Sequence, residues 1–175
     1  MTNQQEHAKT TALEALPLRA NLRGQSPYGA PQLEVEHLLN TNENTHPVPQ
    51  VVVDAIASAV HEAAVSLNRY PDREFTQLRQ RLAAYLGHGL TEENMWAANG
   101  SNEVLQQILQ AFGGPGRKLL SFPPTYSMYP LLASGTNTEY IAGVRNEDFT
   151  LSPESAARQV QETQPNVVFL CSPNN

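Results

Sequence analysis

The sequence predicts an α/β fold with a largely parallel sheet, from three observations. Three short apolar segments have the length and composition of buried strands: Leu119–Phe122, Tyr140–Ala142 and Val167–Leu170. Helical patterns alternate with these strands, as the crossovers of a parallel sheet require. The chain of 175 residues, 40% of them hydrophobic, is also long enough for a domain with its own core.

The chain divides by pattern into residues 1–47, 48–90 and 91–175. The first part has no sustained period and contains turn-forming glycines and prolines, so we expect an arm that lies on another surface. Two amphipathic helices follow. The first begins at Pro49, a suitable first-turn residue, and ends before Pro71, which disfavours helix at the residue before it. Its apolar face contains Val52, Ile56, Val60, Ala63 and Leu67.

The second helix is predicted with Asp72 as its N-cap, and it ends at Gly87–Gly89. The pattern then changes. The apolar segment Met95–Ala98 predicts a strand that turns through Asn99–Asn102 into a third helix, which Gly113–Gly116 ends.

Two further helices are expected between the strand candidates. One covers Tyr126–Ala133. The other begins after Ser152 as N-cap, with Pro153 and Glu154 in its first turn.

Composition excludes several classes of partner. The net charge is -6 and the basic residues are scattered, so the chain is not expected to bind nucleic acid. No apolar run approaches the ~20 residues that span a bilayer, and the N-terminus lacks the order of a secretory signal, so we expect a cytoplasmic protein with no membrane partner. Cys171 is the single cysteine and has no partner for an internal disulfide.

Metal binding is not expected either. The five histidines show no ligand spacing with the cysteine: His7, His37, His46, His61 and His88.

The turn at Gly100, Ser101 and Asn102 is the first candidate for chemistry. A helix start has unpaired N–H groups and a partial positive charge, Gly100 permits close approach, and Ser101 adds a hydroxyl, so the turn suits an anion. The alternative is that Ser101 or Asn102 only caps the helix. The turn has neither the spacing of a Walker loop nor that of the dinucleotide-binding fingerprint. An anion site alone therefore does not identify the ligand.

The second candidate is Tyr126, which follows a strand and the pair Pro123–Pro124. Open α/β sheets bind ligands beyond the carboxyl ends of their strands, so Tyr126 is placed to stack on a flat ring. The alternative is a packing tyrosine at a helix start. Asn175 follows a third strand, and the three loops together suit a phosphorylated aromatic aldehyde.

An ordered set of motifs carries a resemblance to the histidinol-phosphate aminotransferases, which are fold type I enzymes of pyridoxal phosphate. These motifs run from about Leu18 to the last residue and are Leu39–Asn44, Asn68–Asp72, Trp96–Glu103, Leu105–Gln107, Ala111–Gly116, Pro124–Met128 and Ser172–Asn175. The resemblance implies a fold type I PLP-dependent transferase that is truncated. The three parts would be the arm with the substrate entrance, the helices of the small domain and dimer interface, and the first part of the mostly parallel sheet of the large, cofactor-binding domain.

The resemblance also assigns cofactor-binding residues. It implies that Gly100, Ser101 and Asn102 hold the cofactor phosphate, that Tyr126 stacks on the ring and that Asn175 hydrogen-bonds the phenolic oxygen. Tyr70 would reach the cofactor phosphate of the neighbouring subunit, which implies a homodimer. Without the family, Tyr70 is better interpreted as an interface or core tyrosine.

Substrate-binding residues follow from the same resemblance. Asn44 and His46 would line the substrate entrance, together with Tyr70. Thr45 stands where the family commonly has proline.

The implied reaction transfers an amino group from histidinol phosphate to 2-oxoglutarate, giving imidazole acetol phosphate and glutamate. The family places the Schiff-base lysine, the pyridine-facing aspartate and the substrate-phosphate arginines downstream of the Asn-Asn-Pro motif. Lys9 lies in the arm and Lys118 opens a strand at the end far from the cofactor loops, so we expect no catalytic residue in this chain and no turnover by the chain alone. Two alternatives are another fold type I aminotransferase acting on aromatic amines and a non-catalytic dimerising fragment.

Overall fold

The computed structural model describes residues 15–25, 29, 31–38 and 40–174. The described chain separates into two compact units, one from residues 1–25 and 97–175 and the other from residues 26–96. Each unit is treated by itself below.

The unit that contains residues 97–175 is built on a parallel three-stranded sheet. Its strands are β1 (Lys118–Ser121), β2 (Glu139–Ala142) and β3 (Val167–Phe169). The order is β2-β1-β3, with both neighbours parallel to β1. In this register Leu120 lies opposite Ile141 on one side and Val168 on the other. The predicted α/β fold with a parallel sheet is confirmed.

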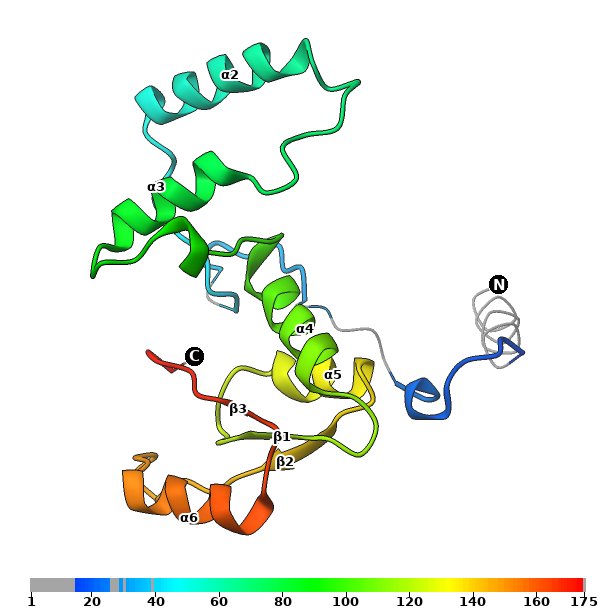
Figure 1. Ribbon diagram of the computed structural model, residues 1–175. Coiled ribbons are helices and arrows are strands. Elements are labelled where there is room, and N and C mark those ends of the chain that lie inside the picture. The colour runs from blue at the N-terminus through cyan, green and yellow to red at the C-terminus, as the bar shows by residue number, and fades with distance from the viewer. Residues whose placement is uncertain (1–14, 26–28, 30, 39, 175) are drawn as a thin grey trace. The chain divides into compact units, whose positions relative to one another are not determined.

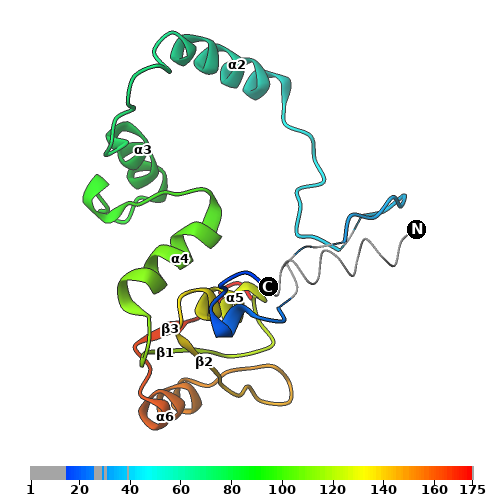
Figure 2. The ribbon, with the colours of Figure 1, turned by 90° about the vertical axis from the view of Figure 1, so that its right-hand side faces the viewer.

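Three helices cover this sheet. They are α4 (Gly100–Phe112), α5 (Met128–Gly135) and α6 (Pro153–Thr163). Figure 1 and Figure 2 show α4 and α5 on one face and α6 on the opposite face. The predicted cap of α6 is confirmed, because the Ser155 N–H donates to Ser152 Oγ at 3.1 Å. Helix α5 begins after Tyr126, which belongs to the loop that leaves β1.

The core lies between the sheet and helices α4 and α5. Its buried members come from α4, β1, α5 and β3: Leu109, Leu119, Tyr129, Leu132, Ala133 and Phe169. Leu120 and Phe122 are buried as well. A Cβ added at Gly143 would lie 2.7 Å from the Phe122 ring, so the chain after β2 packs directly on this aromatic side chain. The carboxyl end of β1 is therefore fixed by packing just before the loop that carries Tyr126.

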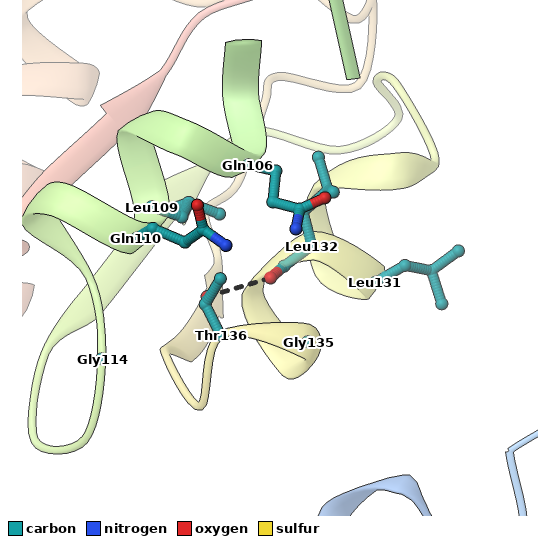
Figure 3. Close-up of a pocket in the computed structure, with 8 residues that line it drawn as sticks. All are labelled: Gln106, Leu109, Gln110, Gly114, Leu131, Leu132, Gly135 and Thr136. Atoms are coloured by element: carbon teal, nitrogen blue, oxygen red, sulfur yellow. Dashed lines mark hydrogen bonds between the residues drawn. The ribbon is translucent and has the colours of Figure 1, made fainter. Parts of the chain in front are cut away.

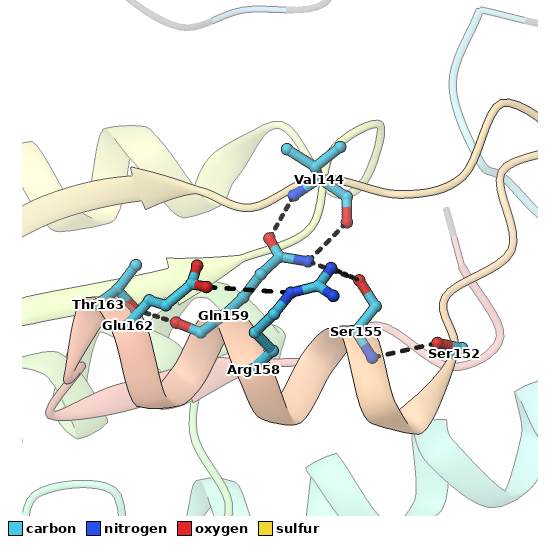
Figure 4. Close-up of polar contacts among 7 residues, drawn as sticks. All are labelled: Val144, Ser152, Ser155, Arg158, Gln159, Glu162 and Thr163. Carbon is cyan, nitrogen blue, oxygen red and sulfur yellow. Dashed lines mark hydrogen bonds and ion pairs between the residues drawn. The ribbon is translucent and has the colours of Figure 1, made fainter.

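The side-chain amide of Gln159 joins α6 to the chain that leaves β2 (Figure 4). Its Oε1 accepts the N–H of Val144 at 2.7 Å, and its Nε2 donates to the Val144 carbonyl at 2.9 Å. This pair of contacts satisfies both backbone groups of one residue, as a neighbouring strand would. The Gln159 side chain therefore continues the pairing of β2, an edge strand of the described sheet.

We expect Gln159→Ala to lower the free energy of unfolding by about 1–2 kcal/mol, because both backbone groups of Val144 lose their partner. The matched control is Gln161→Ala, an exposed glutamine of the same helix, which should change stability by no more than about 0.5 kcal/mol. Urea unfolding of both variants measures the difference. Equal unfolding midpoints would contradict the role of Gln159.

Residues 15–25 of the arm belong to the same unit, and three of their side chains contact the C-terminal end of α5. Arg19 Nη2 donates to the Gly135 carbonyl at 2.7 Å, and Asn21 Nδ2 donates to the Ser134 carbonyl at 2.6 Å. Gln25 Nε2 donates to Ser134 Oγ at 2.9 Å. The last carbonyls of a helix have no intrahelical donor, and a cation is favoured at that end, so this segment supplies what α5 lacks.

In the other unit, α2 (Gln50–Ala64) begins directly after Pro49, so a helix is present where the sequence predicts one. Its apolar residues Val52, Ile56 and Val60 are exposed in the structure.

Helix α3 (Thr76–Leu86) begins later than the sequence predicts. Phe75, with φ of 36°, occupies the N-cap position in place of Asp72. The Asp72 carboxylate still accepts the N–H groups of Thr76 at 2.9 Å and Glu74 at 3.0 Å. These backbone hydrogen bonds, first that of Thr76 and then that of Glu74, hold the pKa of Asp72 below its usual value.

The end of this unit is held by side-chain contacts. The rings of Phe75 and Trp96 meet edge to face with their centroids 5.0 Å apart, and Arg79 Nε donates at 2.8 Å to the carbonyl of Glu92, in the 3-10 turn η2 (Glu92–Asn94). The prediction of a strand at Met95–Ala98 is wrong for the described structure. A strand needs a neighbour for its backbone hydrogen bonds, and no described strand pairs with this segment.

Candidate functional site

The start of α4 contains the three residues of the predicted anion turn, Gly100, Ser101 and Asn102. Gly100 is the first residue of the helix and has φ of +75°, a conformation that favours glycine. Asn99, at the N-cap position, makes no side-chain cap hydrogen bond. The N–H groups of Ser101 and Asn102 in the first turn therefore have neither an intrahelical partner nor a cap from this residue. Ser101 adds an exposed hydroxyl beside them.

Glu103 fixes the shape of this turn. Its Oε2 accepts the backbone N–H of Asn99 at 2.6 Å, so the carboxylate is turned back to the residue before the helix. The Gly100 N–H donates to the Ala98 carbonyl at 2.9 Å and tightens the same turn. The sequence analysis did not single out Glu103. It lies four residues after the N-cap Asn99, one position beyond the capping-box spacing, so no local motif of the sequence pointed to this contact.

The structure brings Asn102 and Tyr126 together from different elements. The Tyr126 hydroxyl donates to Asn102 Oδ1 at 2.9 Å, and both residues are half-buried. The Tyr126 ring meets the ring of Tyr129 edge to face, with centroids 5.6 Å apart. Tyr126 is thus held at its hydroxyl by α4 and at its ring by α5.

Tyr129 supports this arrangement from inside the core. Burial raises the pKa of Tyr129 to about 12, with the thiol of Cys171 as a further cause, so the phenol stays protonated at neutral pH. The Cys171 thiol donates to the Pro173 carbonyl at 3.4 Å. Tyr129 and Cys171 therefore connect the start of α5 to the segment after β3, a link that sequence periodicity could not reveal.

The segment after β3 contacts the loop after β1 through one side-chain amide. Thr125 Oγ1 donates to Asn174 Oδ1 at 2.9 Å, and Asn174 Nδ2 donates to the Pro124 carbonyl at 2.9 Å. The sequence analysis assigned no role to Thr125 or Asn174. Asn175, the predicted partner of the phenolic oxygen, lies outside the described residues.

The remaining predicted site residues belong to the other unit. Tyr70 is fully exposed. Asn44 and His46 are exposed, and Asn44 Oδ1 accepts the His46 N–H at 3.0 Å, which shapes the local turn.

A cavity of about 330 Å³ lies away from these loops (Figure 3). It lies between the second half of α4 and the end of α5, where Gln106, Gln110 and Thr136 supply its polar groups. None of its lining residues ionises near neutral pH, so the cavity has no acid or base for catalysis.

The described residues contain neither a metal-binding cluster nor a membrane-spanning helix. Within residues 15–25, 29, 31–38 and 40–174, no group of three or more His, Cys, Asp or Glu side chains could hold a metal ion. No helix in this described part is long and apolar enough to cross a membrane.

Comparison with known proteins gives a family and close relatives. The family model described as aminotransferase class I and II matches residues 36–175. The chain is 73% identical over 163 residues to histidinol-phosphate aminotransferase from Paenarthrobacter aurescens (strain TC1), covering 93% of this chain and 44% of that relative. It is 60% identical over 164 residues to the enzyme of this name from Thermobifida fusca (strain YX), covering 94% of this chain and 45% of that one.

A Mycolicibacterium smegmatis relative of the same name is 56% identical and is covered over 78% of its length. The chain thus spans less than half the length of the first two relatives.

Solved structures share the fold. Histidinol-phosphate aminotransferase from Sinorhizobium meliloti, in complex with pyridoxal-5'-phosphate, matches with a TM-score of 0.60 at 23% identity, over 74% of this chain and 33% of that one. The enzyme from Clostridium acetobutylicum matches with a TM-score of 0.57 at 20% identity, over 70% of this chain and 34% of that one.

Proposed function

We propose that this chain, which belongs to the aminotransferase class I and II family, is the N-terminal part of a pyridoxal-phosphate-dependent histidinol-phosphate aminotransferase. The reaction would move the amino group of histidinol phosphate to 2-oxoglutarate. The identity of 73% to the Paenarthrobacter aurescens relative of that name supports the choice of substrate.

The contact between Tyr126 and Asn102 is the observation that carries the proposal at the level of the site. A phosphorylated flat-ring cofactor needs an anion site and an aromatic face at a short separation. The 2.9 Å hydrogen bond from the Tyr126 hydroxyl to Asn102 Oδ1 joins the turn that suits the anion to the ring that suits stacking.

The donor set fits the cofactor. The N–H groups of Ser101 and Asn102 and the Ser101 hydroxyl would hold the phosphate, with Gly100 allowing close approach. Glu103 is the acidic residue of this turn, and its Oε2 is engaged by the Asn99 N–H at 2.6 Å. Tyr126 would lie against the ring and Asn175 would donate to its phenolic oxygen. The bound cofactor would supply an electron sink for the substrate carbon.

A homodimer forms part of the proposal. Tyr70 would contact the cofactor phosphate of the neighbouring subunit, and its full exposure in the single chain leaves its hydroxyl accessible to such a partner. Asn44, His46 and Tyr70 would line the substrate entrance. A cytoplasmic location is also proposed.

The lysine that binds the cofactor is proposed to lie outside this chain. Lys118 begins β1 at its amino end, and its Nζ donates to the Thr163 carbonyl at 3.1 Å. Ligands of parallel sheets bind at the opposite, carboxyl end of the strands.

A chimera tests the proposal. Residues 1–175 would replace the matching part of the Paenarthrobacter aurescens relative, and transamination would be assayed with histidinol phosphate and with phenylalanine, using 2-oxoglutarate as acceptor. We expect the chimera to have a higher kcat/KM with histidinol phosphate than with phenylalanine. The unaltered relative, assayed with the same two substrates, is the reference. The isolated chain should show no turnover.

Three results would contradict parts of this proposal. A preference for phenylalanine would favour the alternative of an aromatic aminotransferase. A folded chimera that does not bind pyridoxal phosphate would contradict the cofactor assignment. Turnover by the isolated chain would contradict the placement of the lysine.

A further inference from the structure

The side chain of Asn174 makes two hydrogen bonds to adjacent residues of one loop. Its Oδ1 accepts the Thr125 hydroxyl at 2.9 Å, and its Nδ2 donates to the Pro124 carbonyl at 2.9 Å. Asn174 lies 49 residues from Thr125 in the sequence. The amide therefore ties the loop after β3 to the loop after β1, directly beside Tyr126.

The loop after β1 depends on contacts of this kind. Phe122 is buried at its start and α5 begins at Met128, but Pro123 and Pro124 have no N–H to donate. The start of the loop is instead held through carbonyls that accept side-chain donors: Arg145 Nε donates to the Phe122 carbonyl at 2.7 Å, and Asn174 Nδ2 donates to the Pro124 carbonyl.

The side chain of Tyr126 is held by groups other than Asn174. Asn102 Oδ1 accepts a hydrogen bond from its hydroxyl and Tyr129 packs on its ring, but neither contact fixes the backbone that precedes Tyr126. The pair of hydrogen bonds from Asn174 acts on that backbone. Together the three contacts restrain the position of Tyr126 from α4, from α5 and from the segment after β3.

We propose that Thr125 and Asn174 are positioning residues that fix the Tyr126 ring for the cofactor. This inference rests on the proposed function, in which Tyr126 stacks on the cofactor ring.

Substitutions at Thr125 and Asn174 test whether these residues affect cofactor binding as well as the stability of the loop. Thr125→Val keeps the shape of the side chain and removes the hydroxyl, whereas Thr125→Ser keeps the hydroxyl. Asn174→Ala removes both hydrogen bonds. The matched control is Thr163→Val, which removes a 2.7 Å hydrogen bond from a threonine hydroxyl to the Gln159 carbonyl on α6, away from these loops.

Two measurements are needed, both on the chimera described under Proposed function, because it contains the part of the enzyme that this chain lacks. Hydrogen exchange of the Thr125, Tyr126 and Ser127 amides reports the restraint of the loop without any ligand. Equilibrium dialysis against a series of pyridoxal phosphate concentrations measures the affinity for the cofactor. We expect Thr125→Val and Asn174→Ala to exchange faster and to bind about three- to tenfold more weakly, since one to two hydrogen bonds are lost. Thr125→Ser and Thr163→Val should match the unaltered chimera in both.

Unchanged exchange in Thr125→Val and Asn174→Ala would overturn the restraint itself. Faster exchange with unchanged affinity would overturn the positioning role and leave the proposed function standing. If the unaltered chimera is folded and does not bind pyridoxal phosphate, both the proposed cofactor site and this inference are overturned. The first two results concern the inference alone, so the failures are distinguishable.

Discussion

Replacing Gly113 with alanine should destabilise the unit around the sheet by about 3 kcal/mol, because there is no room for a Cβ. Gly113 follows α4, and its backbone has an extended φ of -91°, so the cost is steric. The added Cβ would lie 2.6 Å from the Leu109 carbonyl oxygen and would overlap Thr138 Oγ1. The first contact is with helix backbone, and the Thr138 hydroxyl already accepts the Gly114 N–H at 2.9 Å, so neither neighbour can move freely.

Thermal unfolding measures this effect. For a chain of this size a loss of about 3 kcal/mol corresponds to a fall in Tm of roughly 10 °C. Gly135→Ala is the matched control, because Gly135 ends α5 and a Cβ there would meet nothing within 4 Å. Alanine also favours helix, so the control should be neutral or stabilising by up to about 1 kcal/mol. Equal Tm values for the two variants would contradict the crowding at Gly113.

Replacing Gly100 with alanine should weaken pyridoxal phosphate binding by about tenfold or more. Its φ of +75° strains any residue with a Cβ, and the turn would rotate to relieve that strain. The first-turn N–H groups of α4 would then no longer face the phosphate. A hydrogen bond to a charged group is worth about 1.5–3 kcal/mol, so the loss of one accounts for the expected change.

Gly116 provides a control with the same backbone conformation. Its φ is +74°, and a Cβ at either glycine would meet nothing within 4 Å. Gly116→Ala should therefore lose the same stability, about 1–2 kcal/mol, while binding the cofactor as the unaltered chain does. Gly116 precedes β1, at the end opposite the candidate site. Urea unfolding and equilibrium dialysis together test this pair. Equal affinities of the two variants would contradict the role of Gly100 in the anion turn.

Local patterns were sufficient for the elements of the unit around the sheet. The strand candidates match β1, β2 and β3 within one residue at each end, and Ser152 caps α6 as expected. These elements depend on apolar periodicity and on caps within three residues of the helix start, which the sequence states directly. The prediction failed at Met95–Ala98, because a strand depends on a neighbour as well as on its own residues.

The features of the candidate site likewise fall into those that local sequence predicts and those that depend on the tertiary structure. The sequence by itself predicted a turn at Gly100–Asn102, to which the proposed function assigns an anion, and it determined the place of Tyr126 after a strand, because both follow from local glycine, proline and strand signals. Only the tertiary structure decided the order β2-β1-β3, the bond from Tyr126 to Asn102, the crowding at Gly113 and the contact between Thr125 and Asn174. The physical reason is separation along the chain. The Tyr126 bond spans 24 residues and the Thr125 bond spans 49, and no periodicity of 2 or 3.6 residues encodes which distant donor meets which acceptor once the sheet has formed.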